Sequence, residues 1–311
     1  MNKGQVIKAT GNRYNVIFND KVVHCVLKGK FKTKEFKTTN PIAVGDFVGF
    51  DFEKDTSYGL IKKIYERKNV LMRKSTNLSR QIHIIATNID FAILLATISK
   101  PTTYPMFIDR FLVACEANNI EAVIVFNKID IYNDEEKETL KSYKKVYEEI
   151  GYKCLEISVK ENINIDKIHK LIENKTIVIS GNSGVGKSSL INALEPGLKL
   201  KTSEISEYHE QGKHTTTFTE MHKIGKGNII DTPGIRGFGL NNIKKEELSL
   251  FFPEMRKIKD NCKFNNCTHT HEPQCAVKLA VENGKINQLR YKNYLSIFYD
   301  EDDKHRLDKY V

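Results

Sequence analysis

Three short motifs stand in an order along this chain that strongly restricts its fold. Asn127-Lys128-Ile129-Asp130 comes first, a glycine-rich loop from Gly181 to Ser188 comes second, and Asp231-Thr232-Pro233-Gly234 comes last. Each motif follows a short apolar run of the kind that forms a buried strand in a parallel sheet. Two stretches with helical spacing alternate with such runs: 106–117 and 134–150. The alternation predicts an α/β domain with a doubly wound sheet over residues 69–239.

The glycine-rich loop has the pattern G-x-x-x-x-G-K-S and lies between a predicted strand, 176–180, and a predicted helix. Glycines let backbone N–H groups surround phosphates, and the helix N-terminus adds positive potential. Lys187 is expected to bridge the β- and γ-phosphates, and the Ser188 hydroxyl to bind Mg²⁺. The predicted nucleotide contacts in this segment are Gly181, Asn182, Ser183, Gly184, Val185, Gly186, Lys187, Ser188 and Ser189.

The motif from Asn127 to Asp130 predicts that the nucleotide is GTP. The Asp130 carboxylate can accept hydrogen bonds from N1–H and the 2-amino group of guanine, and adenine offers neither donor. Ser158-Val159-Lys160 follows the predicted strand 154–157 and is expected to place a backbone N–H on guanine O6. The predicted base contacts are Asn127, Lys128, Ile129, Asp130, Ser158, Val159 and Lys160.

The third motif and the segment before it predict the Mg²⁺ and γ-phosphate contacts. Asp231 is expected to hold Mg²⁺ through water, and the Gly234 N–H to contact the γ-phosphate. In Gly212-Lys213-His214-Thr215-Thr216-Thr217, one threonine is expected to complete the Mg²⁺ shell. Thr216 is favoured, and Thr215 is the alternative. Ser188, Thr216 and Asp231 are therefore the predicted magnesium ligands.

The residue after the third motif is Ile235, where many GTPases have a glutamine that orients the attacking water. Because isoleucine cannot hydrogen-bond water, another group must do so, or hydrolysis is slow until a partner assists. His214 and Arg236 are the nearest candidates, and His214 is favoured because it lies in the first switch segment. The alternative is that His214 is a turn residue without a catalytic role. The predicted catalytic residues are Lys187, His214 and Thr216.

A cysteine cluster near the C-terminus predicts a structural zinc site. Cys262-x₄-Cys267-x-His269-x₅-Cys275 supplies three thiolates and an imidazole, and four protein ligands leave no open position for chemistry. His271 is an alternative to His269, and core cysteines without a metal are the alternative to a zinc site. Residues 240–311 are otherwise predicted to be helical, with helices over 275–282 and 286–299. The other three cysteines lie in apolar surroundings and are predicted to be core residues: Cys25, Cys115 and Cys154.

Residues 1–68 contain several short β-rich runs separated by turn residues, which favours a small barrel of the OB-fold type. The chain has a net charge of +10, which suggests a polyanionic partner. Lysines alternate with other residues from Lys28 to Lys34, and Phe31 and Phe36 lie among or beside them, as base stacking requires. The alternative is an edge strand protected from aggregation by lysines.

No apolar run reaches membrane length, and Met1 to Gln5 lacks the apolar stretch of a signal peptide. The protein is therefore expected to be cytoplasmic, without a membrane partner. In that compartment six cysteines indicate metal binding or core packing rather than disulfides. A monomer is the simplest expectation.

Taken together, these motifs resemble those of the circularly permuted GTPases of the small-ribosomal-subunit-dependent GTPase A (RsgA) family. The resemblance covers essentially the whole chain, including the motif order, the segment 212–216, the N-terminal barrel and the cysteine cluster. It implies a late assembly factor for the small (30S) ribosomal subunit, whose GTP hydrolysis the subunit stimulates and which contacts ribosomal RNA through its outer domains. Two alternatives remain: a GTP-dependent RNA-binding scaffold, and a permuted GTPase acting on the large subunit or another structured RNA.

The motif order also suggests a checkpoint. The second switch, 231–239, runs directly into the zinc domain, so a γ-phosphate that orders the switch could reposition that domain. The GTP form would then hold the subunit, and hydrolysis would release it.

Overall fold

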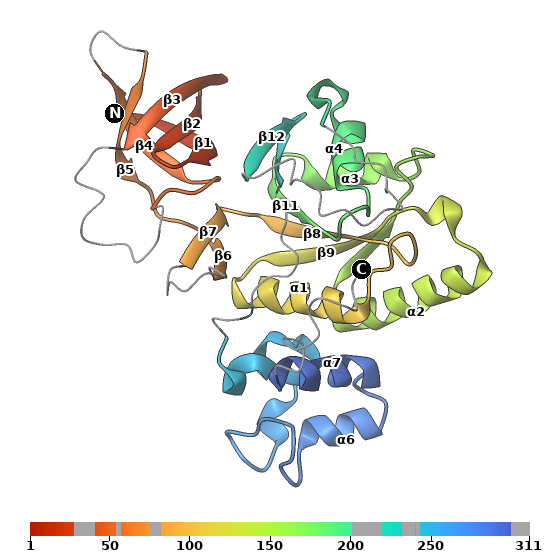
Figure 1. Ribbon diagram of the computed structural model, residues 1–311. Helices are drawn as coiled ribbons and strands as arrows, with labels where there is room; N and C mark the ends of the chain where they lie inside the picture. Colours follow the sequence, from red (N-terminus) through yellow and green to blue (C-terminus); the bar gives the residue numbers. More distant parts are fainter. Residues whose placement is uncertain are drawn as a thin grey trace, which may run out of the picture.

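The computed structural model describes residues 1–27, 41–53, 57–74, 82–200, 219–231, 240 and 243–299. A barrel, an α/β unit and a small helical unit follow one another along the chain, from red to blue in Figure 1. The fold class predicted from the sequence is confirmed. Within the described residues, no helix has both the length and the apolar character needed to cross a membrane.

The N-terminal unit is a closed five-stranded barrel. Its strands are β1 (Asn2–Thr10), β2 (Arg13–Phe18), β3 (Lys21–Leu27), β4 (Phe47–Phe52) and β5 (Gly59–Ile64). They pair in the order β1-β2-β3-β5-β4, and β4 closes the barrel by pairing with β1. Alternate residues point inward, so Val6, Tyr14, Val16, Cys25 and Phe50 form its core.

The barrel is attached to the rest of the molecule by a hairpin and by one strand pairing. The hairpin is formed by β6 (Val70–Lys74) and β7 (Ile82–Thr87). The fully buried Asp46 of the barrel accepts two hydrogen bonds from Arg67, each 2.7 Å long, and one of 2.8 Å from the Thr87 hydroxyl. In addition, Lys8 of β1 pairs with Glu220 of β12, so that barrel and α/β strands form one eleven-stranded sheet.

The α/β unit has five parallel strands and one antiparallel strand in the order β10-β9-β8-β11-β13-β12. The strands are β8 (Phe91–Ala96), β9 (Glu121–Phe126), β10 (Lys153–Glu156), β11 (Thr176–Ser180), β12 (Glu220–Ile224) and β13 (Gly227–Asp231). The chain enters this sheet at its centre, moves outward through β9 and β10, and returns to β11 on the other side of β8. The phosphate-loop strand is therefore not the first of this sheet along the chain.

Helices cover both faces of this sheet. They are α1 (Pro105–Ala117), α2 (Asp134–Ile150), α3 (Ile165–Ile172) and α4 (Lys187–Leu194), with short 3-10 helices η2 (Ile129–Ile131) and η3 (Pro196–Leu198). Helices α1 and α2 pack on one face, and α3 and α4 on the other (Figure 1). The helix predicted over 134–150 is confirmed. Its bounds are set locally, since Asn133 and Glu136 form a capping box at its start and Gly151 ends it at φ 117°.

The C-terminal unit packs against α1. Its helices are η4 (Lys245–Phe251), α5 (Pro253–Arg256), η5 (Lys259–Asn261), α6 (Ala276–Glu282) and α7 (Gln288–Phe298). The prediction of helices over 275–282 and 286–299 is confirmed with small shifts. Helix α7 begins later than expected because the Asn287 side chain caps it, accepting from Leu289 N at 2.8 Å.

Candidate nucleotide site and metal centre

The predicted nucleotide-binding residues that the structure describes gather at one edge of the α/β sheet. Residues 127–130 follow β9, 158–160 follow β10, 181–189 follow β11, and Asp231 ends β13. These four strands are parallel, so their carboxyl ends share one edge, where ligands bind in open α/β sheets. Several predicted residues lie outside the described residues: His214, Thr215, Thr216, Gly234, Ile235, Arg236 and the basic segment 28–37.

Asn127 connects three of the loops at this edge. Its side chain is 2% exposed, and its Nδ2 donates to the Val185 carbonyl of the phosphate loop at 2.8 Å. Its Oδ1 accepts from Val159 N at 3.2 Å. A Cβ on Gly186 would lie 2.5 Å from Asn127 Nδ2, and φ at Gly186 is +100°, so this position needs glycine.

Asp130 and Ser158 form a second connection. The Ser158 hydroxyl donates to Asp130 Oδ1 at 2.6 Å and accepts from Glu161 N at 3.0 Å. Ser158 is fully buried, so its hydrogen bond fixes the direction of the Asp130 carboxylate. The arrangement brings Ser158 and Val159 beside the guanine motif, while the contact of this loop with guanine O6 stays a prediction.

The backbone of the phosphate loop takes positive φ angles at three glycines, Gly181, Gly184 and Gly186. Gly181 has φ +150°, and a Cβ there would lie 2.3 Å from the Leu95 carbonyl oxygen of the neighbouring β8. The Lys187 ammonium donates to the carbonyls of Gly181 and Asn182, both at 2.8 Å. Burial lowers the pKa of Lys187, and Asp231 acts in the opposite direction. A phosphate would give this buried ammonium a full counter-charge.

The structure adds one residue at this edge that sequence reasoning missed. Tyr132 follows η2, and its buried hydroxyl bonds to the backbone of the guanine loop. The only sequence signal for this contact is an aromatic residue two positions after Asp130, and the same signal would be equally consistent with a core residue.

The predicted zinc ligands lie together in the C-terminal unit. The ligand atoms of Cys262, Cys267, His269 and Cys275 are all within 4.8 Å of one another. Cys262 Sγ lies 3.9 Å from Cys275 Sγ, and His269 Nδ1 lies 3.6 and 3.4 Å from these two sulfurs. A zinc tetrahedron has edges of about 3.8 Å between sulfurs and about 3.5 Å between sulfur and nitrogen. The four residues could therefore hold one zinc ion.

His269 belongs to this cluster and the exposed His271 does not, among the residues that the structure describes. The Tyr291 hydroxyl donates to the His269 carbonyl at 2.7 Å and supports the loop from outside the cluster. Burial raises the pKa of the Cys267 thiol, and a bound cation would act in the opposite direction by favouring the thiolate.

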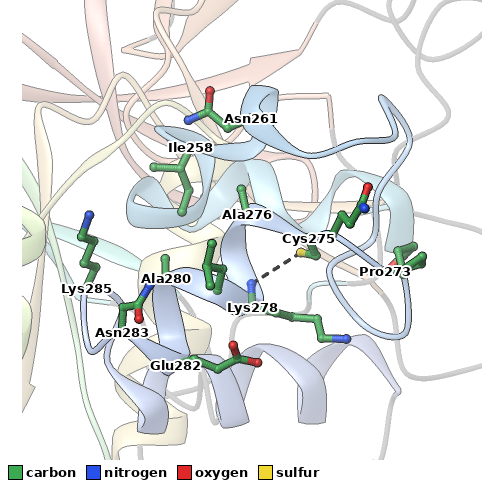
Figure 2. A pocket seen from close by; sticks show the side chains of 13 residues that line it. Ile258, Asn261, Pro273, Cys275, Ala276, Lys278, Ala280, Glu282, Asn283 and Lys285 are labelled. Carbon is green, nitrogen blue, oxygen red and sulfur yellow. Dashed lines mark hydrogen bonds between the residues drawn. The ribbon is translucent and has the colours of Figure 1, made fainter.

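The first turn of α6 completes this centre. Backbone N–H groups donate to two of the sulfurs, Ala276 N to Cys262 at 3.3 Å and Lys278 N to Cys275 at 3.5 Å. Figure 2 shows the second of these bonds beside an open groove of about 670 Å³ that α6 lines. The remaining cysteines are buried core residues as predicted: Cys25, Cys115 and Cys154.

Comparison with known proteins identifies the family. The family model described as RsgA GTPase matches residues 64–241, and that of the RsgA N-terminal domain matches residues 3–61. The chain belongs to the RsgA family. It is a GTPase, as the sequence predicted, with the circularly permuted fold.

Relatives of similar length support this assignment. The chain is 51% identical to the small ribosomal subunit biogenesis GTPase RsgA of Flavobacterium psychrophilum, over 99% of this chain and 95% of the relative. It is 50% identical to the protein of the same name from Christiangramia forsetii, over 99% of both.

Two crystal structures have the same fold. YjeQ from Thermotoga maritima is 34% identical with a TM-score of 0.79, covering 96% of this chain and 98% of that one. YloQ, described as a circularly permuted GTPase, is 33% identical with a TM-score of 0.76, covering 98% and 96%.

Proposed function

We propose that this protein hydrolyses GTP while acting as an assembly factor for the small ribosomal subunit. The observation that carries the nucleotide part is the Asn127 amide, which joins the guanine motif, the phosphate loop and the 158–160 loop at one sheet edge. The named role of the full-length relatives supports the ribosomal part.

In the proposed complex, Asp130 reads the guanine edge and the 181–189 loop binds the phosphates. Lys187 neutralises the β- and γ-phosphates, and the Gly234 N–H contacts the γ-phosphate. Ser188, Thr216 and Asp231 hold Mg²⁺, with Thr215 as the alternative to Thr216. Hydroxyl and carboxylate oxygens are the ligands this ion prefers, which supports the assignment.

We propose that His214 orients the attacking water and that hydrolysis is slow in the free protein. Ile235 supports the second point, since its side chain has no group that could bind water. The small subunit is then expected to stimulate turnover by completing or ordering this part of the site.

The three units are proposed to act as an RNA-binding barrel (1–68), a GTPase domain (69–239) and a zinc-binding domain (240–311), in a cytoplasmic monomer. A basic and aromatic patch on the barrel supports contact with ribosomal RNA. Lys3 Nζ lies 4.9 Å and Lys63 Nζ 4.8 Å from the Tyr65 ring centre, and Lys3 lies 5.1 Å from that of Phe47.

The decisive experiment is GTP turnover by the purified protein, alone and with purified small or large ribosomal subunits. Stimulation by the small subunit alone supports the proposal. Stimulation by the large subunit alone would move the target there. No stimulation by either would favour the RNA-binding scaffold, for which Ile235 is the supporting observation.

Release on hydrolysis is a separate proposal with its own test. If the GTP form holds the subunit, its affinity must exceed that of the GDP form, because a ligand with equal affinity for two states shifts nothing. Equal subunit affinity with GDP and with a non-hydrolysable GTP analogue would remove this part of the proposal.

A further inference from the structure

Tyr132 closes the guanine motif into a loop. Its hydroxyl donates to the Asn127 carbonyl at 2.5 Å and accepts from Ile98 N at 2.9 Å. Asn127 is the first residue of the motif, and Ile98 lies just beyond the end of β8. One phenol therefore joins the two ends of the motif loop and attaches them to the segment that follows β8.

The surroundings of this hydroxyl keep it in place and protonated. Tyr132 is 5% exposed, and its ring packs in the core between the sheet and helices α1 and α2. Burial raises its pKa to about 12, so the hydroxyl stays protonated throughout the neutral range.

The guanine loop needs such support because its backbone is strained. Lys128 has φ +65°, in the left-handed region that non-glycine residues avoid. Residues in such conformations persist where the surrounding structure determines them strongly. The hydrogen bond that the Tyr132 hydroxyl donates acts on the Asn127 carbonyl, directly before this residue.

The segment after β8 holds the guanine loop at a second point as well. The Lys128 ammonium donates to the Lys100 carbonyl at 2.5 Å. The segment is closed on itself by Thr103, whose N–H donates to the Thr97 carbonyl at 2.8 Å and whose hydroxyl accepts from Thr97 N at 3.1 Å. The guanine loop is thus held at two points, by Tyr132 to Ile98 and by Lys128 to Lys100.

We propose that Tyr132 is a positioning residue for guanine recognition. Its hydroxyl holds the loop 127–130 in the geometry in which Asp130 meets the base edge, while it touches no part of the nucleotide itself. This inference rests on the proposed guanine site.

The test is Tyr132→Phe, which removes one oxygen and keeps the ring in the core. The Asn127 carbonyl and the Ile98 N–H lose their shared partner, so the KM for GTP is expected to rise about tenfold while kcat stays within about twofold. The preference for GTP over ITP is expected to fall, because ITP lacks the 2-amino group that a well-placed Asp130 would bind.

Tyr152→Phe is the matched control. Tyr152 is also buried in this core, and its hydroxyl donates to Glu116 Oε1 at 3.2 Å, away from the guanine motif. This variant should lose thermal stability without changing the KM or the GTP-to-ITP ratio. If Tyr132→Phe behaves in the same way, Tyr132 is only a structural residue and the inference is wrong.

Asp130→Asn, measured in parallel, separates this inference from the proposed function. Asparagine can donate to the 2-carbonyl of xanthine, so this variant is expected to shift the preference toward XTP. No change in base preference would place the guanine site elsewhere and overturn both. A shift with Asp130→Asn and an unchanged ratio with Tyr132→Phe would overturn the Tyr132 inference alone.

Discussion

At the scale of single residues, Gly186 ties the phosphate loop to the guanine motif. In Gly186→Ala the new Cβ would push against Asn127 Nδ2, so we expect nucleotide affinity to fall by about tenfold or more. The measurement is the Kd for GDP. Gly225→Ala is the control, because Gly225 also has a positive φ (+53°) but nothing within 4 Å of the added Cβ. The control should show backbone strain in its melting temperature and unchanged Kd; equal Kd losses in both variants would contradict the prediction.

Also at this scale, His214→Ala tests the proposed water-orienting residue. We expect kcat to fall by about a hundredfold with little change in nucleotide affinity, since the imidazole would act on water and not on the bound nucleotide. The measurement is single-turnover GTP hydrolysis with the small subunit present, together with the Kd for a non-hydrolysable analogue. An unchanged kcat would remove His214 from the mechanism and leave Arg236 or the subunit as the source.

At the scale of elements, we expect the loop that carries the four candidate zinc ligands, 262–275, to depend on metal binding for its folding together with α6. His269→Ala is expected to lower the zinc content from one per chain and to unfold this region, because structural zinc contributes directly to folding. His271→Ala is the matched control, since His271 lies two residues away and is exposed. Metal analysis and hydrogen exchange of α6 are the measurements. If loss of His271, and not of His269, lowered the zinc content, the ligand assignment would be wrong.

At the scale of the whole molecule, a buried ion-pair network docks the C-terminal unit on the α/β unit. Arg290 of α7 donates to Asp109 of α1 at 2.5 Å and to Glu254 of α5 at 2.8 Å. Tyr147 and Asn293 also donate to Asp109, at 2.9 and 2.5 Å. A swing of the whole C-terminal unit would have to break these contacts. The motif order alone suggested that the second switch could reposition this unit, but with this network in place we expect any movement with nucleotide state to stay local to the switch.

Arg290→Met tests this docking. It leaves two carboxylates without their cation, and we expect a loss of about 3–5 kcal/mol in the free energy of unfolding. The control is Arg256→Met, whose partner across the same interface is Glu116 at 2.9 Å. Arg256 is 47% exposed, and such pairs are worth about 0–1 kcal/mol. The measurement is denaturant unfolding. If both variants lost a similar free energy of unfolding, burial of the Arg290 network would not explain its contribution to stability.

Local features of the sequence were enough to predict the class of fold and many of the residues of the candidate site. Apolar runs predicted the strands, glycines indicated the phosphate loop, and each motif directly followed its predicted strand. The cysteine spacing indicated the metal centre because its ligands lie within one short loop, where sequence distance restricts spatial distance. Local pattern also placed α2, since its capping residues are adjacent to it.

The tertiary structure decided which distant residues meet. Asp109 and Arg290 are 181 positions apart, and nothing local indicates that they form one pair. The structure shows that His269 and not His271 lies in the cysteine cluster, which depends on the direction of each ring. The role of Tyr132 depends on a hydrogen bond between its hydroxyl and Ile98, 34 positions earlier. The pairing of β1 with β12 likewise joins the barrel to a strand 212 positions away. Such contacts arise from packing of the whole chain, because a buried polar group takes whichever partner the completed core brings within reach.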